Sequence, residues 1–164
     1  MYDFLLRPRL LMTGFATAVF LAGCAAPVSA PPEPVKTVPK CAAAAPGDPL
    51  VGNWLSVRKQ KGVAGELRTL YTLNADGVMA YTEQLKRGKN PSQGLDEGGC
   101  WRHDKQTLVL KTLESNGAPV NLDDPIYTNR YTVVSAGANA LTLKAADGAT
   151  ITARRMSPGY RLPF

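Results

Sequence analysis

The chain has 164 residues, with 19 lysines and arginines against 13 aspartates and glutamates, a formal net charge of +6 and a single histidine. One histidine leaves few ways to build a catalytic triad, and no glycine-rich phosphate loop stands between a strand and a helix. Adjacent carboxylates occur only as Asp96-Glu97 and Asp123-Asp124, in segments that look like loops. We therefore expect a protein that is not an enzyme and that has no cofactor.

The first 23 residues have the layout of a secretory signal peptide. Arg7 and Arg9 precede an apolar run over residues 10–23, which is shorter than the roughly 20 residues needed to span a bilayer as a helix. The segment Leu21-Ala22-Gly23-Cys24 at its end resembles the lipobox of bacterial lipoproteins. That resemblance implies cleavage of residues 1–23 and lipidation of Cys24, on its sulfur and on the new amino group.

The residue after the lipobox bears on localisation. It is Ala25 and not aspartate, and in enteric-type bacteria the resemblance then implies transport to the outer membrane. We expect the protein on the periplasmic face of that membrane, with the membrane as a partner through its lipid anchor. Without residues 1–23 the chain keeps 17 basic and 12 acidic side chains and has no run of like charges. Exported proteins rarely meet nucleic acid, so we expect no nucleic-acid partner; the oligomeric state stays open.

Residues 24–49 have the composition of a tether. Positions 25–49 contain seven prolines and seven alanines, and proline both removes amide donors and favours extended polyproline II backbone. Such a segment has little means of packing a core, so we interpret 24–49 as a disordered spacer. The folded domain should then cover residues 50–164, a length that suits one domain with a modest core.

The sequence pattern of this domain is typical of an all-β fold. Short alternating runs rich in threonine, valine and tyrosine are separated by turn sequences such as Asn-Ala-Asp-Gly at 74–77. About eight strands joined mostly by short links favour an up-and-down antiparallel sheet that closes into a small barrel. The expected strands are 52–60, 66–73, 78–86, 100–103, 107–114, 127–135, 138–145 and 150–156, and the longest predicted loops are 87–99 and 115–126.

The start and the end of this domain resemble lipocalins and smaller lipocalin-like domains. "LVGNWLS" matches the Gly-x-Trp opening of that family with Gly52 and Trp54. The resemblance implies that Trp54 packs beneath the barrel against an arginine of the last strand. Alternation selects Arg155, which shares a face with Ile151 and Ala153, whereas Arg154 does not.

The aromatic side chains permit two interpretations of function. Tyr71, Tyr81, Trp101 and Tyr131 can line a pocket for a small apolar ligand, or they can be core residues of a filled barrel. In the first case the domain is a non-catalytic binding module. In the second it is a protein-interaction or structural module of the cell envelope, such as an assembly factor or a hydrolase inhibitor, acting through the two long loops.

Two cysteines remain once Cys24 is lipidated. An oxidising periplasm favours a disulfide between Cys41 and Cys100, although two free thiols, intermolecular pairing and metal binding stay open as alternatives. His103 lies three residues after Cys100, but two ligands do not make a zinc site. His103 also precedes a predicted turn, where we expect it to be exposed, and we expect no metal.

Overall fold

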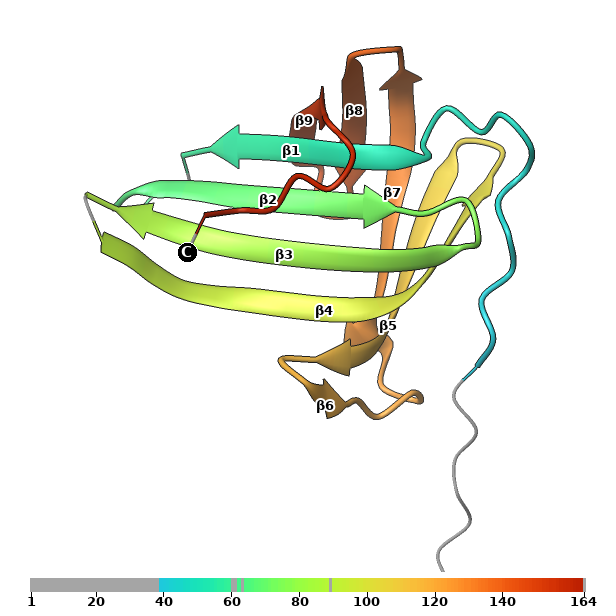
Figure 1. Ribbon diagram of the computed structural model, residues 1–164, viewed down its shortest axis with the longest axis horizontal. Helices are drawn as coiled ribbons and strands as arrows, with labels where there is room; N and C mark the ends of the chain where they lie inside the picture. Colours follow the sequence, from blue (N-terminus) through green and yellow to red (C-terminus); the bar gives the residue numbers. More distant parts are fainter. Residues whose placement is uncertain (1–38, 60–61, 63, 89, 164) are drawn as a thin grey trace, which may run out of the picture. The chain divides into compact units, whose positions relative to one another are not determined.

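The computed structural model describes residues 39–59, 62, 64–88 and 90–163 (Figure 1). The predicted signal peptide, the lipobox, Cys24 and the first part of the predicted tether lie outside the described residues. The strands are β1 (Gly52–Arg58), β2 (Glu66–Leu73), β3 (Val78–Arg87), β4 (Asn90–Asp104), β5 (Thr107–Ser115), β6 (Ala118–Pro119), β7 (Thr128–Ala136), β8 (Ala140–Ala145) and β9 (Thr150–Met156).

Eight of these strands form a closed antiparallel barrel. Each of the eight strands pairs with the next one along the chain, and β5 pairs with β7. Pairing of β9 with β1 closes the ring. β6 adds only a short extension to β5. The predicted fold class, a small up-and-down β-barrel with a lipocalin-like architecture, is confirmed. Closure pairs strand edges that would otherwise be exposed.

Helix is scarce in the described part of the chain. A single 3-10 turn, η1 (Pro125–Tyr127), precedes β7, and the Asp124 side chain caps it by accepting a hydrogen bond from the amide of Ile126. Among the described residues, no helix has the length and the hydropathy that a membrane crossing would require.

The prediction of a loop over residues 87–99 is wrong, because most of this segment belongs to the longest strand, β4. From Asn90 to Asp96 this strand pairs only with β3, and its pairing with β5 begins at Glu97. The first half is therefore an edge, where Pro91 is tolerated although it lacks an amide donor. β4 then continues into the second half of the barrel wall.

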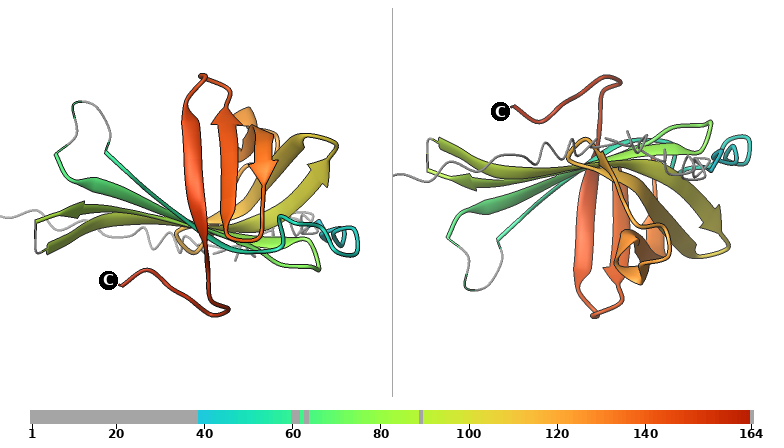
Figure 2. Two further views of the ribbon diagram at one scale, coloured as in Figure 1. Left: turned by 90° about the horizontal axis from the view of Figure 1, so that it is seen from above. Right: turned by 90° about the horizontal axis from the view of Figure 1, so that it is seen from below.

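The barrel has two unlike ends. At the closed end lie the start of β1 and the β2–β3, β4–β5 and β7–β8 turns, and at the open end lie the β1–β2 and β3–β4 connections. β2, β3 and β4 run on past the strands β7–β9, which stand across them (Figures 1 and 2). The outer halves of these three strands therefore form an extended wall on one side of the open end.

The core fills the closed half of the barrel. On β3, alternation places Met79 inside and Val78 outside. The inward side chains of seven strands, together with Leu50, meet in one apolar cluster. Its buried members are Leu50, Trp54, Tyr71, Leu73, Met79, Trp101, Leu108, Leu110, Leu141, Leu143, Ile151 and Ala153.

The C-terminal segment 157–163 lies against the outer face of β1–β3. Leu162 is buried there against Leu55 and Leu70. Two side chains of the sheet hold the backbone of the segment: the Asn53 amide donates to Ser157 O at 2.9 Å, and the Gln84 amide donates to Pro163 O at 2.8 Å. A groove of about 640 Å³ remains between this segment and the strands. The outward residues Leu55 of β1 and Leu70 of β2 are thus covered by the chain itself.

Candidate functional site

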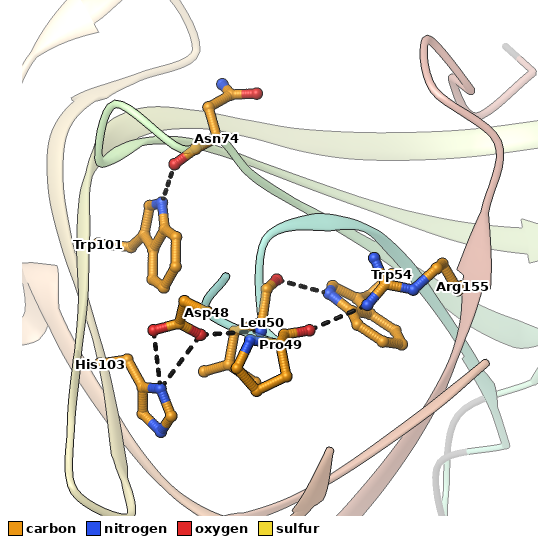
Figure 3. Close-up of polar contacts among 8 residues, drawn as sticks. All are labelled: Asp48, Pro49, Leu50, Trp54, Asn74, Trp101, His103 and Arg155. Atoms are coloured by element: carbon orange, nitrogen blue, oxygen red, sulfur yellow. Dashed lines mark hydrogen bonds and ion pairs between the residues drawn. The ribbon is translucent and has the colours of Figure 1, made fainter. Parts of the chain in front are cut away.

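Trp54 and Arg155 meet at the closed end of the barrel (Figure 3). The Arg155 guanidinium carbon lies 4.0 Å from the centre of the Trp54 ring, and the two residues are register partners on β1 and β9. The indole donates to Leu50 O at 2.8 Å, while the guanidinium donates to Pro49 O at 2.9 Å and to Val51 O at 2.7 Å. The stacked pair therefore ties the first and last strands to the segment that enters the barrel.

Gly52 is required by this arrangement. Its φ is +139°, and a Cβ atom at this position would lie 2.4 Å from Nη1 of Arg155. Any larger residue would therefore displace the guanidinium from Trp54. Gly52 and Trp54, predicted from the Gly-x-Trp resemblance, and Arg155, predicted from alternation, thus lie in contact with one another.

The segment 39–51 packs over the same end and belongs to the same compact unit as the barrel. Asp48 bonds to Nδ1 of His103 at 3.0 and 3.2 Å, and the side chains are 6% and 18% exposed. The same carboxylate accepts from the amide of Leu50 at 2.9 Å, which turns the chain into the core (Figure 3). The expectation that His103 is exposed is therefore wrong, because Asp48, 55 residues earlier in the chain, packs against its ring.

The predicted disulfide between Cys41 and Cys100 is confirmed, with a Cα–Cα distance of 5.2 Å. It fixes the segment 39–51 to the outer face of β4. One residue after Cys41 the chain passes over Gly77, and a Cβ atom at Gly77 would lie 1.9 Å from Ala42 O. The last part of the predicted tether is thus held along the barrel by a covalent bond and by close backbone contact.

Side chains across β2 and β3 form layers from the closed end to the open end. Register partners on the inner face are Leu73 with Met79, Tyr71 with Tyr81, Thr69 with Glu83 and Leu67 with Leu85. The ring of Tyr71 lies edge-on to Tyr81, with centroids 5.3 Å apart, and edge-on to Tyr131 on β7 at 6.3 Å. An aromatic layer therefore separates the apolar core from a polar layer nearer the mouth.

The polar layer holds two carboxylates. Glu83 accepts a hydrogen bond from the Tyr81 hydroxyl at 2.7 Å and one from the Thr69 hydroxyl at 3.3 Å. Glu97 on β4 accepts from the Thr112 hydroxyl at 3.2 Å. Thr69 and Thr112 are both buried. The barrel thus turns acceptor groups inward just above its tyrosines, and we call Glu83, Glu97, Tyr81, Tyr131 and Arg58 the mouth cluster.

Burial dominates the titration of this region. It is the largest cause that raises the pKa of Tyr71, Tyr81 and Tyr131, and the positive charge of Arg58 opposes it at Tyr71 and Tyr131. Burial also raises the pKa of the Glu97 carboxyl. The Arg58 Nε is buried and has no hydrogen-bond partner among the described residues. Arg58 lies on the inner face of β1, and its charge acts on the two tyrosines that border the polar layer.

A hollow of about 380 Å³ opens beside Glu83, toward the outer end of the extended wall. It is lined by residues of β2, β3 and β4 and by Asn116, which follows β5. The apolar part of the lining comes from Leu67, Leu85 and Leu95. The hollow therefore combines an apolar surface with one carboxylate.

The four aromatic residues proposed for a pocket do not act alike in the structure. Tyr71 and Trp101 are each 2% exposed and belong to the packed core, and the Trp101 indole is held by Asn74 O at 2.8 Å (Figure 3). Tyr81 and Tyr131 are only partly buried and border the mouth cluster. Glu83, Glu97 and Arg58 were not among the residues predicted from the sequence. Alternation alone could have placed Glu83 beside Tyr81, two residues away on the same strand face.

The buried tyrosines predict a loss of stability at alkaline pH. The folded chain keeps the hydroxyls of Tyr71 and Tyr81 neutral, whereas the unfolded chain ionises them near pH 10. Above that pH the unfolded state binds fewer protons, so the free energy of unfolding falls by up to about 1.4 kcal/mol per pH unit for each group. Denaturant titrations across this range should show a shallower decline for the Tyr71→Phe/Tyr81→Phe variant. Equal slopes in the variant and the unmodified chain would contradict the prediction.

Comparisons with known proteins give no family for the chain. No protein-family model matches it, and no curated protein matches it significantly.

Proposed function

We propose that this protein is an exported lipoprotein, anchored by Cys24 to the periplasmic face of the outer membrane, whose barrel is a non-catalytic binding module. The lipobox-like segment ending at Cys24 supports the anchor. The disulfide between Cys41 and Cys100 agrees with an oxidising compartment. The observation that carries the binding role is the mouth cluster beside its hollow.

The lining of the hollow defines the ligand. Leu67, Leu85 and Leu95 provide apolar contact, and the Glu83 carboxylate provides a hydrogen-bond acceptor at the inner edge. The ligand is therefore a small molecule with an apolar body and an amine or hydroxyl group as donor. A wholly apolar ligand fits less well. To find only apolar contacts it would have to pass deeper into the barrel, where the packed side chains of Tyr71 and Trp101 block its way.

The filled core favours one alternative. Twelve buried residues occupy the closed half of the barrel, as in a module whose interior is structural. In that case the protein would bind an envelope protein through its surface. The predicted loop 87–99 no longer supports this role because it is a strand, whereas the connection around η1 stays open to solvent, with Ile126 exposed.

Native mass spectrometry of the protein extracted from its own membrane tests the proposal. We expect extra mass in the native spectrum that is lost on denaturation. The denaturing mass should correspond to an acylated chain that starts at Cys24 and lacks the two hydrogens of one disulfide. A native mass equal to the denatured mass would contradict the ligand proposal and favour the filled barrel with a protein partner.

A matched pair of variants locates the ligand. Glu83→Gln preserves the size of the side chain and removes the charge, so affinity for the retained molecule should fall by about tenfold. Glu66→Gln removes an equal charge from the outer face of β2, where Glu66 pairs with Arg68 at 3.3 Å, and should leave the bound fraction unchanged. Equal occupancy in both variants would place the ligand elsewhere on the molecule.

A further inference from the structure

The outer face of β4, β5, β7, β8 and β9 carries an excess of positive charge. Arg102 and Arg130 both lie opposite Val109 in the strand register, so their backbones are about 10 Å apart in one row. Lys144 lies diagonally from Arg130 on the neighbouring strand, because its register partner is Thr132. We call Arg102, Arg130, Lys144 and Arg154 the cationic face; all four are exposed.

These charges are not neutralised within the described part of the chain. The ion pairs found there join Arg68 to Glu66 and His103 to Asp48, and neither involves the cationic face. Several threonines occupy other outward positions of these strands, and the acidic residues are Asp104 at the end of β4 and, toward the open end, the exposed Asp96 on β4 and Glu114 on β5. Asp147 lies at the edge, in the β8–β9 turn. A surface on which four exposed basic side chains have no ion-pair partner points to an anionic partner.

The N-terminal segment reaches the barrel beside this face. Cys100, which is bonded to Cys41, shares the outer face of β4 with Arg102, two residues along the strand. Residue 24 precedes Pro39 by fifteen positions, which span at most about 50 Å whatever their conformation. The outer face of β1–β3 differs, since the segment 157–163 covers much of it and Glu66 neutralises Arg68.

We propose that the cationic face binds the anionic lipid headgroups of the membrane that holds the anchor, so that the barrel lies on the bilayer with β7–β9 toward it (Figure 2). This inference rests on the proposed lipid anchor. The anchor keeps the barrel near the bilayer, and the cationic face selects its orientation. Each basic side chain near an anionic surface changes the ratio of membrane-facing to free orientations by about fivefold. The open end then stays accessible from the periplasm.

Lysine footprinting on the acylated protein tests the orientation. The chain is reconstituted into bilayers of phosphatidylcholine alone or mixed with phosphatidylglycerol, acetylated with an amine reagent and mapped by mass spectrometry. We expect Lys144 to react several-fold more slowly on the anionic bilayer, and the difference to vanish at about 1 M salt, where the screening length is ~3 Å. Lys86, exposed at the outer end of β3, should react equally on both bilayers.

Two triple variants provide the matched comparison. Arg102→Gln/Arg130→Gln/Arg154→Gln should reduce the membrane-facing ratio by about 100-fold and abolish the protection of Lys144. Lys59→Gln/Lys86→Gln/Arg161→Gln removes the same charge from exposed positions elsewhere and should preserve the protection. Equal reactivity of Lys144 on both bilayers would overturn the proposal, as would equal protection of the detergent-solubilised chain by free inorganic phosphate. A denaturing mass without acyl chains would refute the anchor instead, and the footprint on added vesicles would still report on the cationic face.

Discussion

Replacing Trp54 with alanine is expected to lower the free energy of unfolding by about 4 kcal/mol, which is a large part of the stability of a domain of this size. The side chain is completely buried at the centre of the closed end. Its loss leaves a cavity, removes the hydrogen bond to Leu50 O and leaves the Arg155 guanidinium without the ring on which it stacks. Denaturant titration followed by circular dichroism measures the effect.

A valine on the outside of the barrel provides the control for this substitution. Val134 is 60% exposed on β7, so Val134→Ala should change the free energy of unfolding by less than about 0.5 kcal/mol. An unchanged unfolding midpoint for Trp54→Ala would contradict the closure of the barrel by the Trp54–Arg155 pair. The comparison distinguishes loss of the Trp54–Arg155 pair from a general effect of shortening a side chain.

Much of the barrel could be predicted because its strands obey simple alternation. Tyr71 and Leu73 share the inner face with Leu67, and Leu141 shares it with Leu143, as period-2 patterns require. The same rule selected Arg155 over Arg154 on the last strand, and the structure places only Arg155 against Trp54. These positions could be assigned because one face of each strand is buried and the other is not.

The first half of β4 could not be predicted, because it does not have one buried face and one exposed face. From Asn90 to Asp96 the strand has β3 on one side and no partner strand on the other, so neither the apolar pattern nor the exclusion of proline applies. Its glycines and charged residues resemble those of a loop. Backbone pairing with β3, which sequence patterns do not report, makes it a strand.

The mouth cluster depends on contacts between distant strands. Glu83 and Thr69 face each other because a short turn sets the β2–β3 register, and this pairing could be inferred locally. Glu97 joins them only because β4 is a strand, and Arg58 only because β1 lies next to β2. Residues that look like solubilising charges in the sequence therefore become inward groups once the barrel closes.

Removing the disulfide between Cys41 and Cys100 is expected to lower the free energy of unfolding by about 4 kcal/mol. The bond closes a loop with a sequence separation of 59, and the entropy that such a loop removes from the unfolded chain has this magnitude. The folded barrel should survive, because the core is built by side chains of seven strands and by Leu50 rather than by the cysteines. Denaturant titrations of the protein with and without a reductant measure the difference.

The Cys41→Ser/Cys100→Ser variant distinguishes this effect from other actions of the reductant. Its stability should equal that of the reduced protein and should not change when reductant is added, whereas single substitutions would leave a reactive thiol. Segment 39–47 should also exchange its amide hydrogens faster in this variant, while Asp48 still holds His103 and Leu50. An oxidised protein no more stable than the double variant would mean that the segment is fixed by packing alone. The disulfide would then set where the tether meets the barrel, beside Arg102, without contributing to the stability of the fold.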